Sequence, residues 1–432
     1  MAKDNTAVSF FFSRAVPGRN TSDKLWPTIA LQLCALGSGL RKAVNAAVSK
    51  SPDIFEKSLD RQLSTLVAEP TRSVNWWWSR RIFFLIIDGI DECQGEDQQC
   101  AILTSIASII HEHRLPLRFL IASRPEPHIR RAFEDHDLQR VCYPVFLNER
   151  FHPIEDVHRF LRNKFDKLCD EHPALVTISR PWPSDNEVKF LADKSGGQFI
   201  YATTVLKFID DEDSRPVDQL EKVMNLSRSG IDVGSAAASG DTFLELDLLY
   251  RQILSTCRNR SLLLRILGCI LVAEEPVSVL DVENLLSLRE GDVGMTLRRI
   301  HSLLFIPKTP TECIGVYHKS LSDFMFNRDR AQDYYIDYDL CYEVLTYACM
   351  EVIRRDGVKA IRQYAGKWWD THCIKARITD TLVDGLRLLL SPPSALYLDR
   401  DHQKLTFATS AMKVWKHWTV REPAWTGIFR KF

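Results

Sequence analysis

One apolar segment of the sequence ends in a group of carboxylates. Residues Ile82 to Ile87 are almost all apolar, and Asp88, Asp91 and Glu92 follow directly. A buried parallel strand opens at its carboxyl end into the crevice where such sheets bind ligands. In a phosphate site, an aspartate at this place holds Mg²⁺, and an acidic residue a few positions later orients the attacking water. The pattern predicts Asp88 as a metal ligand and Asp91 or Glu92 as the water-orienting group, with a helix-capping turn as the alternative.

A second apolar segment ends in an arginine. Leu117 to Ala122 is followed by Ser123-Arg124-Pro125, and the proline prevents a central strand from continuing. A guanidinium at a strand end can bind a γ-phosphate through two hydrogen bonds. We therefore predict that Asp88 and Arg124 converge on one triphosphate pocket, although an isolated strand-end arginine is more often a solvated charge.

The sequence lacks the motif that grips the phosphates of a nucleotide. No segment reads Gly-x-x-x-x-Gly-Lys-Ser/Thr, the loop whose backbone amides and lysine cradle the phosphates. For this reason we do not expect tight ATP binding or turnover by this polypeptide.

The segments that position these residues alternate between strand and helix patterns over residues 1–150. Such alternation predicts a parallel sheet with helical crossovers. The expected strands are Val8 to Phe12, Ile82 to Ile87, Leu117 to Ala122 and Val141 to Leu147, and the expected helices are Leu25 to Leu36, Pro52 to Val67 and Asp97 to His113.

The remaining sequence is predicted to be helical, so the fold class is α/β followed by all-α. Residues 151–256 form a helical domain with breaks at Ser179 to Asp185 and at Ser227 to Gly240, and the second break is the expected linker. In residues 257–330, three helices precede two short strands, which is the winged-helix pattern. Residues 331–432 form a C-terminal helical region with aromatic anchors at Trp368, Trp369, Trp415 and Trp418.

Composition excludes several broad classes of protein. The chain has 56 basic and 56 acidic residues, so no net charge attracts it to nucleic acid or to an anionic membrane. Its 11 dispersed cysteines indicate reduced thiols rather than a disulfide framework. No signal segment and no membrane-spanning segment is recognisable. We expect a cytoplasmic protein with protein partners.

Other sites have weaker support. His111 and His113 are two residues apart and would lie on different faces of a helix, unlike zinc ligands. Arg298 and Arg299 lie on the third helix of the predicted winged helix, but two arginines supply little positive charge for DNA binding. Trp76-Trp77-Trp78 could bind a partner or a membrane surface, but anchoring of the next strand is the favoured interpretation.

Four segments together resemble a known family. Phe10-Phe11-Phe12-Ser13-Arg14, Trp26-Pro27-Thr28-Ile29-Ala30, Leu85-Ile86-Ile87-Asp88-Gly89-Ile90-Asp91-Glu92-Cys93 and Ala122-Ser123-Arg124-Pro125 look like the NACHT-type, nephrocystin-3-like N-terminal modules of fungal STAND-class signalling NTPases. The resemblance continues through Gly196 to Ala202 and Val316 to Phe324. It covers residues 8 to 330.

The resemblance implies a switch operated by ATP, ADP and Mg²⁺. In such modules ADP holds the closed state, exchange for ATP opens it, and the opened form assembles to pass a signal to effector domains. By resemblance, Asp88 serves Mg²⁺, Asp91 or Glu92 the hydrolytic water, and Arg124 the γ-phosphate. His318 would touch the bound diphosphate, with a partly buried strand-end histidine as the alternative.

The sequence departs from the family in one respect. The Gly-rich loop and its strand precede the Phe-Phe-Phe-Ser-Arg strand in that family, so we expect this chain to be truncated and its sheet to lack a central strand. Two functions remain open: an NTPase-type signalling switch defective in ATP binding, or a non-catalytic scaffold for protein interactions.

Overall fold

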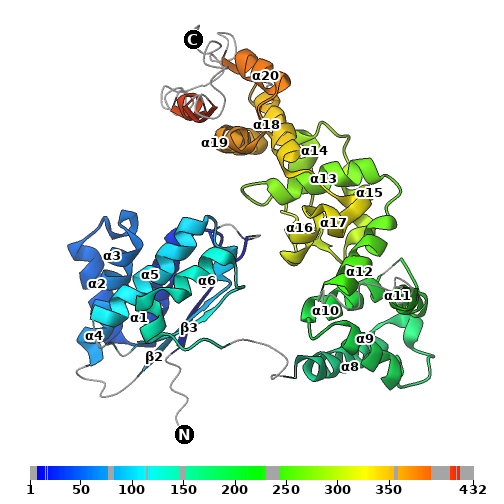
Figure 1. Ribbon diagram of the computed structural model, residues 1–432, viewed down its shortest axis with the longest axis horizontal. Helices are drawn as coiled ribbons and strands as arrows, with labels where there is room; N and C mark the ends of the chain where they lie inside the picture. Colours follow the sequence, from blue (N-terminus) through cyan, green and yellow to red (C-terminus); the bar gives the residue numbers. More distant parts are fainter. Residues whose placement is uncertain are drawn as a thin grey trace. The chain divides into compact units, whose positions relative to one another are not determined.

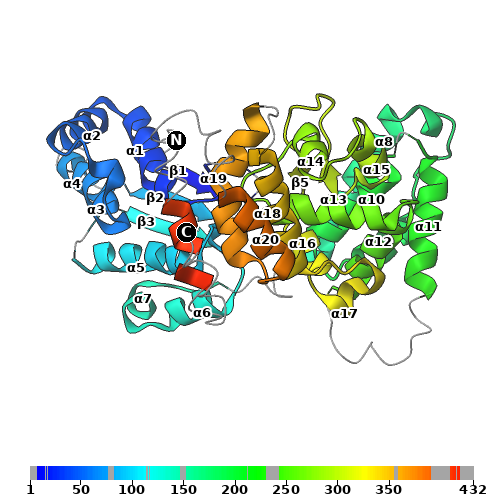
Figure 2. The same ribbon diagram turned by 90° about the horizontal axis from the view of Figure 1, so that it is seen from above.

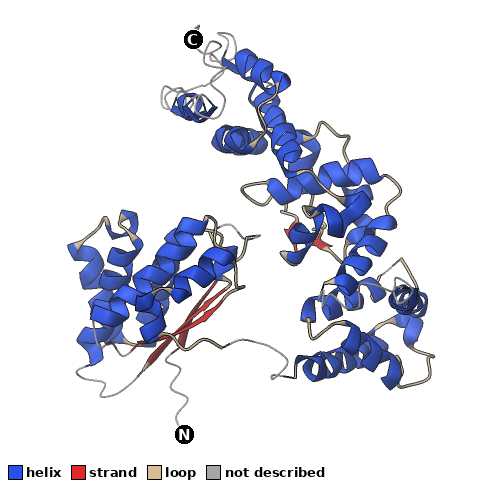
Figure 3. Cartoon of the chain, viewed as in Figure 1, coloured by secondary structure: helices blue, strands red, loops and turns tan. Residues whose placement is uncertain are grey.

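The computed structural model divides into two compact units, residues 1–146 and 147–432 (Figures 1 and 3). It describes residues 7–418 apart from residues 15, 17, 76–81, 113, 114, 116, 146–151, 212, 230–242, 355–358, 391–408 and 415. The first unit contains the sheet and its helices. Within the described residues, the second unit is helical except for one short hairpin. Each unit has its own hydrophobic core.

Three parallel strands form the sheet of the first unit. They are β1 (Ala7–Phe11), β2 (Phe83–Asp88) and β3 (Leu117–Ala122), in the order β1-β2-β3. The register pairs Phe10 with Ile87 and Ile87 with Ile121. The three strands predicted at these positions and their parallel direction are confirmed.

The sheet has one covered face and one open face. Val8, Phe10, Leu85, Ile87 and Leu117 point to the covered face and are buried. Figure 1 shows the labelled helices of the first unit gathered on that side, and Figure 2 shows the same helices from above. The alternating burial of β2 follows directly from the two-residue period of a strand.

The helices of the first unit follow the predicted alternation, with one correction. The segment predicted as a helix from Pro52 to Val67 instead becomes continuously helical at Leu59 and continues to Asn75. A π-helical turn lies just before Pro70, because proline has no N–H for the regular α-helical ladder. The other helices are α1 (Leu25–Leu36), α2 (Ser38–Lys50), α5 (Glu96–Glu112), α6 (Pro127–Glu134) and α7 (His136–Val141).

The fourth predicted strand, Val141 to Leu147, is wrong over its described part. Val141 ends helix α7, which Asp135 caps by accepting the N–H of Asp137. Residues Cys142 to Val145 adopt neither helix nor strand. The local cap and the short helix override a β-like composition in this segment.

The second unit begins with helices that surround a shared core. The break predicted at Ser179 to Asp185 lies between η6 and α9. The break predicted at Ser227 to Gly240 begins too early, because α11 continues to Ser229, and its remaining residues lie outside the described part of the chain. The bounds are α8 (Pro153–Glu171), η6 (Pro173–Leu175), α9 (Asp185–Lys194), α10 (Phe199–Ile209), α11 (Pro216–Ser229) and α12 (Leu244–Ser255).

Three helices and a hairpin occur in the order that the sequence predicts. The helices are α13 (Arg260–Val272), α14 (Val279–Leu285) and α15 (Asp292–Leu297), and the antiparallel strands are β4 (Leu304–Phe305) and β5 (Gly315–Val316). Assignment of this segment to the winged-helix class stays a prediction, as does the division of the second unit into three domains.

Helices continue to the end of the described chain. They are α16 (Ser320–Met325), α17 (Arg328–Ala331), α18 (Tyr338–Arg354), α19 (Lys359–Lys375) and α20 (Asp380–Leu390). Trp369 and Trp418 are fully buried in this region. No helix in the described part of the chain combines the length and hydropathy needed to cross a bilayer. All 11 cysteines are free thiols.

Several predicted features fall on residues that the structure does not describe. These are the Trp76-Trp77-Trp78 cluster, His113, Trp415 and most of the predicted linker, residues 230–242.

Candidate functional site

A left-handed turn carries the acidic motif away from strand β2. Gly89 has φ +72°, a conformation that glycine adopts without steric cost. A Cβ at this position would also lie 3.4 Å from the carbonyl oxygen of Phe12. The short helical turn Ile90–Glu92 follows and points Asp91 inward. Gly89 therefore allows the chain to place one acid of the motif inside the fold and another near its surface.

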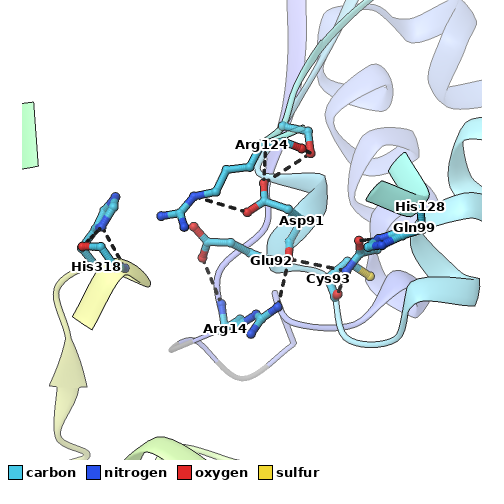
Figure 4. Close-up of polar contacts among 10 residues, drawn as sticks. Arg14, Asp91, Glu92, Cys93, Gln99, Arg124, His128 and His318 are labelled. Carbon is cyan, nitrogen blue, oxygen red and sulfur yellow. Dashed lines mark hydrogen bonds and ion pairs between the residues drawn. The ribbon is translucent and has the colours of Figure 1, made fainter. Parts of the chain in front are cut away.

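Asp91 is a buried link between the ends of β2 and β3. Its side chain is only 4% exposed. Its Oδ1 accepts the backbone N–H of Arg124 at 3.0 Å and the hydroxyl of Ser123 at 3.3 Å, and its Oδ2 lies 3.7 Å from Nε of Arg124 (Figure 4). Buried carboxylates are stable when donors satisfy them in this way. The predicted water-orienting role for Asp91 thus competes with a structural role.

Glu92 is the more accessible acid of the pair. Its Oε2 accepts the backbone N–H of Arg14 at 3.3 Å. Burial raises the pKa of the Glu92 carboxyl above its ordinary value, although the hydrogen bond from Arg14 opposes this rise. A carboxylate with a raised pKa is a better proton acceptor. Of the two predicted candidates, Glu92 is therefore the one whose carboxyl is not held by the end of β3, and its role toward a water molecule stays a prediction.

Asp88 and Arg124 come from neighbouring strands of one sheet. Asp88 pairs in register with Ala122, and Arg124 follows Ala122 by two residues. Asp88 is exposed at the carboxyl end of β2, and the Arg124 side chain is 34% exposed. Both residues therefore lie at the edge of the sheet where parallel strands commonly bind ligands. Their roles in phosphate binding stay a prediction.

Arg14 is a component of this edge that the motif-based prediction did not include. It follows β1, and its guanidinium donates to the carbonyl oxygen of Asp91 at 3.2 Å. All three strands thus deliver a polar or charged residue to the same edge. Arg14 ends the Phe10 to Arg14 segment on which the family resemblance rests, and a search of every strand end for charged residues would have found it as a site candidate.

A hydrogen-bonded pair supports the acidic turn from the side of α5. The Gln99 amide donates to the carbonyl oxygen of Cys93 at 2.6 Å, and its oxygen lies 2.6 Å from Nε2 of His128. Gln99 is almost fully buried. No sequence signal marks this pair, because it joins residues on two different helical segments.

The edge fits one end of a Mg²⁺–phosphate group. Mg²⁺ is commonly held by one or two carboxylates together with waters and phosphate oxygens, and Asp88 supplies one exposed carboxylate. Among the described residues, no group of three or more potential metal-ligating side chains is present. Arg14 and Arg124 supply donors for phosphate oxygens. The sequence supplies no glycine-rich cradle for the other phosphates.

His318 belongs to the second unit, where its Nδ1 is engaged by Ser320. The backbone N–H of Ser320 donates to its Nδ1 at 3.1 Å, so the neutral ring carries its proton on Nε2. The Ser320 hydroxyl lies 2.6 Å from the same nitrogen and 2.8 Å from the hydroxyl of Tyr250. Burial raises the pKa of Tyr250 to about 12, so its hydroxyl stays protonated and can donate to the Ser320 hydroxyl. The predicted diphosphate contact of His318 stays a prediction.

Comparison with known families agrees with the strand-end motifs. The family model described as "Nephrocystin 3, N-terminal" matches residues 1–124, which contain β1, β2, β3 and Arg124. The chain thus contains a nephrocystin-3-like N-terminal region. No curated protein matches the sequence.

Proposed function

We propose that this protein is a signalling switch module of the NACHT-type STAND NTPase class whose sheet edge responds to a Mg²⁺-bound nucleotide. The proposal is supported by the nephrocystin-3-like region and by the sequence positions of Arg14, Asp88, Glu92 and Arg124, which lie at or just after the carboxyl ends of three parallel strands. The single observation that carries it is the register of β2 and β3, which pairs Asp88 with Ala122, two residues before Arg124.

In this proposal each residue has a separate task. Asp88 contacts the metal, whose charge would neutralise the phosphates. The Arg124 guanidinium donates to a terminal phosphate oxygen, and Arg14 adds positive charge beside it. Glu92 orients a water molecule, and Asp91 holds the two strand ends in place.

Affinity should be low because the phosphate cradle is missing from the sequence. The two arginines and one metal-binding carboxylate contact only the terminal part of a nucleotide. We therefore expect binding in the high micromolar to millimolar range and little or no turnover by the purified chain.

Titration with a fluorescent ATP analogue in the presence of Mg²⁺ tests the proposal. Arg124→Ala removes the guanidinium but keeps the backbone N–H that binds Asp91, and Asp88→Asn removes one exposed charge. Each should weaken binding about 10- to 100-fold, because a hydrogen bond to a charged group contributes about 1.5–3 kcal/mol. Arg130→Ala and Asp97→Asn are the matched controls, since both side chains are exposed elsewhere in the first unit. Equal affinity in all five proteins would reject the site.

A scaffold without nucleotide chemistry is the second candidate. The observation that favours it is the engagement of Asp91 by Ser123 and Arg124, which is what a purely structural carboxylate would show. Absence of saturable binding at millimolar nucleotide, by a chain that is folded by circular dichroism, would select this function.

A further inference from the structure

The two outer edges of the three-stranded sheet differ in the hydrogen bonding of their outward backbone groups. At the outer edge of β1, the Gln32 amide accepts the backbone N–H of Ser9 at 2.8 Å and donates to the carbonyl oxygen of Ser9 at 2.7 Å. One side chain therefore satisfies both outward backbone groups of Ser9, at the middle of this edge. Edge strands are commonly protected in such ways against unwanted pairing.

The outer edge of β3 has no corresponding cover among the described residues. β3 is the terminal strand of the sheet and pairs with β2 alone. The carbonyl oxygen of Ala122 accepts the N–H of Gly89, so Ala122 faces β2. In a parallel strand, the N–H and C=O groups of one residue point to the same side, and those of the next residue point to the opposite side. Since Ala122 faces β2, Phe119 and Ile121 direct their N–H and C=O groups away from β2. These groups can accept another strand.

An apolar surface lies beside this edge. We define the open face as the side of the sheet formed by Phe11, Phe84, Ile86 and Leu120. Phe11 is 49% exposed, Phe84 48% and Leu120 61%. Parallel sheets are normally covered on both faces, because their strands are apolar on both. Exposed apolar surface of this kind marks an interaction site.

Charge at the two ends of the open face indicates what covers it. Asp88 is exposed at the carboxyl end of β2, and Arg118 is exposed near the opposite end of β3, beside Phe84. A helix that runs antiparallel to the strands brings its positive N-terminus to Asp88 and its negative C-terminus to Arg118. A helix that follows a parallel strand runs in this direction.

We propose that the β3 edge and the open face together bind a strand–helix segment of a separate polypeptide. Its strand pairs in parallel with β3, and its apolar helix covers Leu120, Ile86 and Phe84. A second copy of this chain fits less well. Pairing of two β3 edges leaves both open faces bare, and stacking of two open faces leaves both edges unpaired. The proposal does not depend on nucleotide binding.

A synthetic strand–turn–helix peptide, with a valine- and isoleucine-rich strand and a leucine-rich helix face, is the probe. Its helix carries lysines in the first turn and acidic residues in the last turn, which match Asp88 and Arg118. Binding to the full chain is measured by fluorescence anisotropy, and amide hydrogen exchange is followed at Phe119 and Ile121. We expect fast exchange at both amides in the free chain and at least a tenfold slowing with the peptide.

Two variants and two control peptides make the test specific. Leu120→Glu should weaken binding at least tenfold, whereas Leu31→Glu, at a leucine that is 72% exposed on α1, should not. A peptide with proline in its strand should lose the protection of β3, and one with the two charged turns exchanged should bind more weakly. The proposal is overturned if β3 is already protected in the free chain or if the peptide gives no protection at millimolar concentration. It is also overturned if the chain is a dimer in sedimentation that Leu120→Glu dissociates.

Discussion

The Asp91 carboxylate accepts the backbone N–H of Arg124 at 3.0 Å across a sequence separation of 33 residues. This bond fixes the point where β3 ends relative to the turn that follows β2. Since the donor is a backbone group, the link survives substitution of the Arg124 side chain by any residue except proline, which has no N–H. The backbone N–H of Arg124 thus positions the end of β3, while its guanidinium remains partly exposed and can contact a ligand.

Loss of the Asp91 carboxylate should destabilise the first unit. Asp91→Ala leaves the Arg124 N–H without its acceptor, whereas the Ser123 hydroxyl keeps the Arg124 carbonyl oxygen at 3.1 Å. An unsatisfied buried group costs about 1–3 kcal/mol. Asp88→Ala, at an exposed position, should change the free energy of unfolding by less than about 0.5 kcal/mol. Urea unfolding followed by circular dichroism measures both. Equal stability of the two variants would show that Asp91 does not support the fold.

A buried ion pair should hold α12 to α17. Nε and Nη2 of Arg330 donate to the Asp247 carboxylate at 2.8 and 2.7 Å, and the Asp247 side chain is 5% exposed. Arg330→Ala leaves a buried charge without this partner and should cost about 3–5 kcal/mol. Arg260→Ala breaks an exposed pair with Asp333 and should cost no more than about 1 kcal/mol. Thermal and urea unfolding of both variants tests the contrast, and a cost near that of Arg260→Ala for both would refute it.

Two glycines in the second unit should respond oppositely to alanine. Gly197 has φ +82°, and a Cβ there would lie 2.6 Å from Cγ of Pro153. Gly197→Ala should therefore destabilise the protein by about 1–3 kcal/mol. Gly366 lies inside α19 with no atom within 4 Å of the added Cβ, so Gly366→Ala should stabilise by about 0.5–1 kcal/mol. The melting temperatures should move in opposite directions, and a common direction would contradict the assigned backbone geometry.

Stability should fall in acid partly because of one buried histidine. Burial lowers the pKa of His372 to about 3, its Nε2 lies 3.0 Å from the Tyr364 hydroxyl, and its Nδ1 has no hydrogen-bond partner among the described residues. An unfolded histidine binds a proton below about pH 6.5 whereas the folded one does not. The stabilisation is therefore complete above pH 6.5 and is lost as the pH falls toward 3, by about 1.4 kcal/mol per pH unit.

Unfolding measured between pH 6.5 and 4 tests this sign. His372→Gln should lower the pH dependence of the free energy of unfolding, because the slope from this side chain disappears. His136→Gln, at an exposed histidine, should keep the wild-type slope. An unchanged slope in His372→Gln would mean that other groups cause the acid sensitivity.

Local patterns in the sequence determined which segments form strands and where Asp88 and Arg124 lie on them. The apolar runs that become β1, β2 and β3, and the helices α1 and α5, follow from side-chain periodicity, which is a property of neighbouring residues. The strand predicted from Val141 is wrong, and the cause is also local. Asp135 caps a short helix that extends to Val141, and this helix replaces the start of the predicted strand.

Only the tertiary structure decided which acid is buried, which backbone groups of the sheet edge are satisfied and which face is open. Gln32 satisfies both outward backbone groups of Ser9 from 23 residues away, and Asp91 reaches Arg124 from 33 residues away. Such contacts depend on the packing of distant elements, and the types and spacing of neighbouring residues do not encode them. The physical reason is that a buried N–H or C=O group needs a hydrogen-bond partner, and any suitable group that folding brings close can provide it.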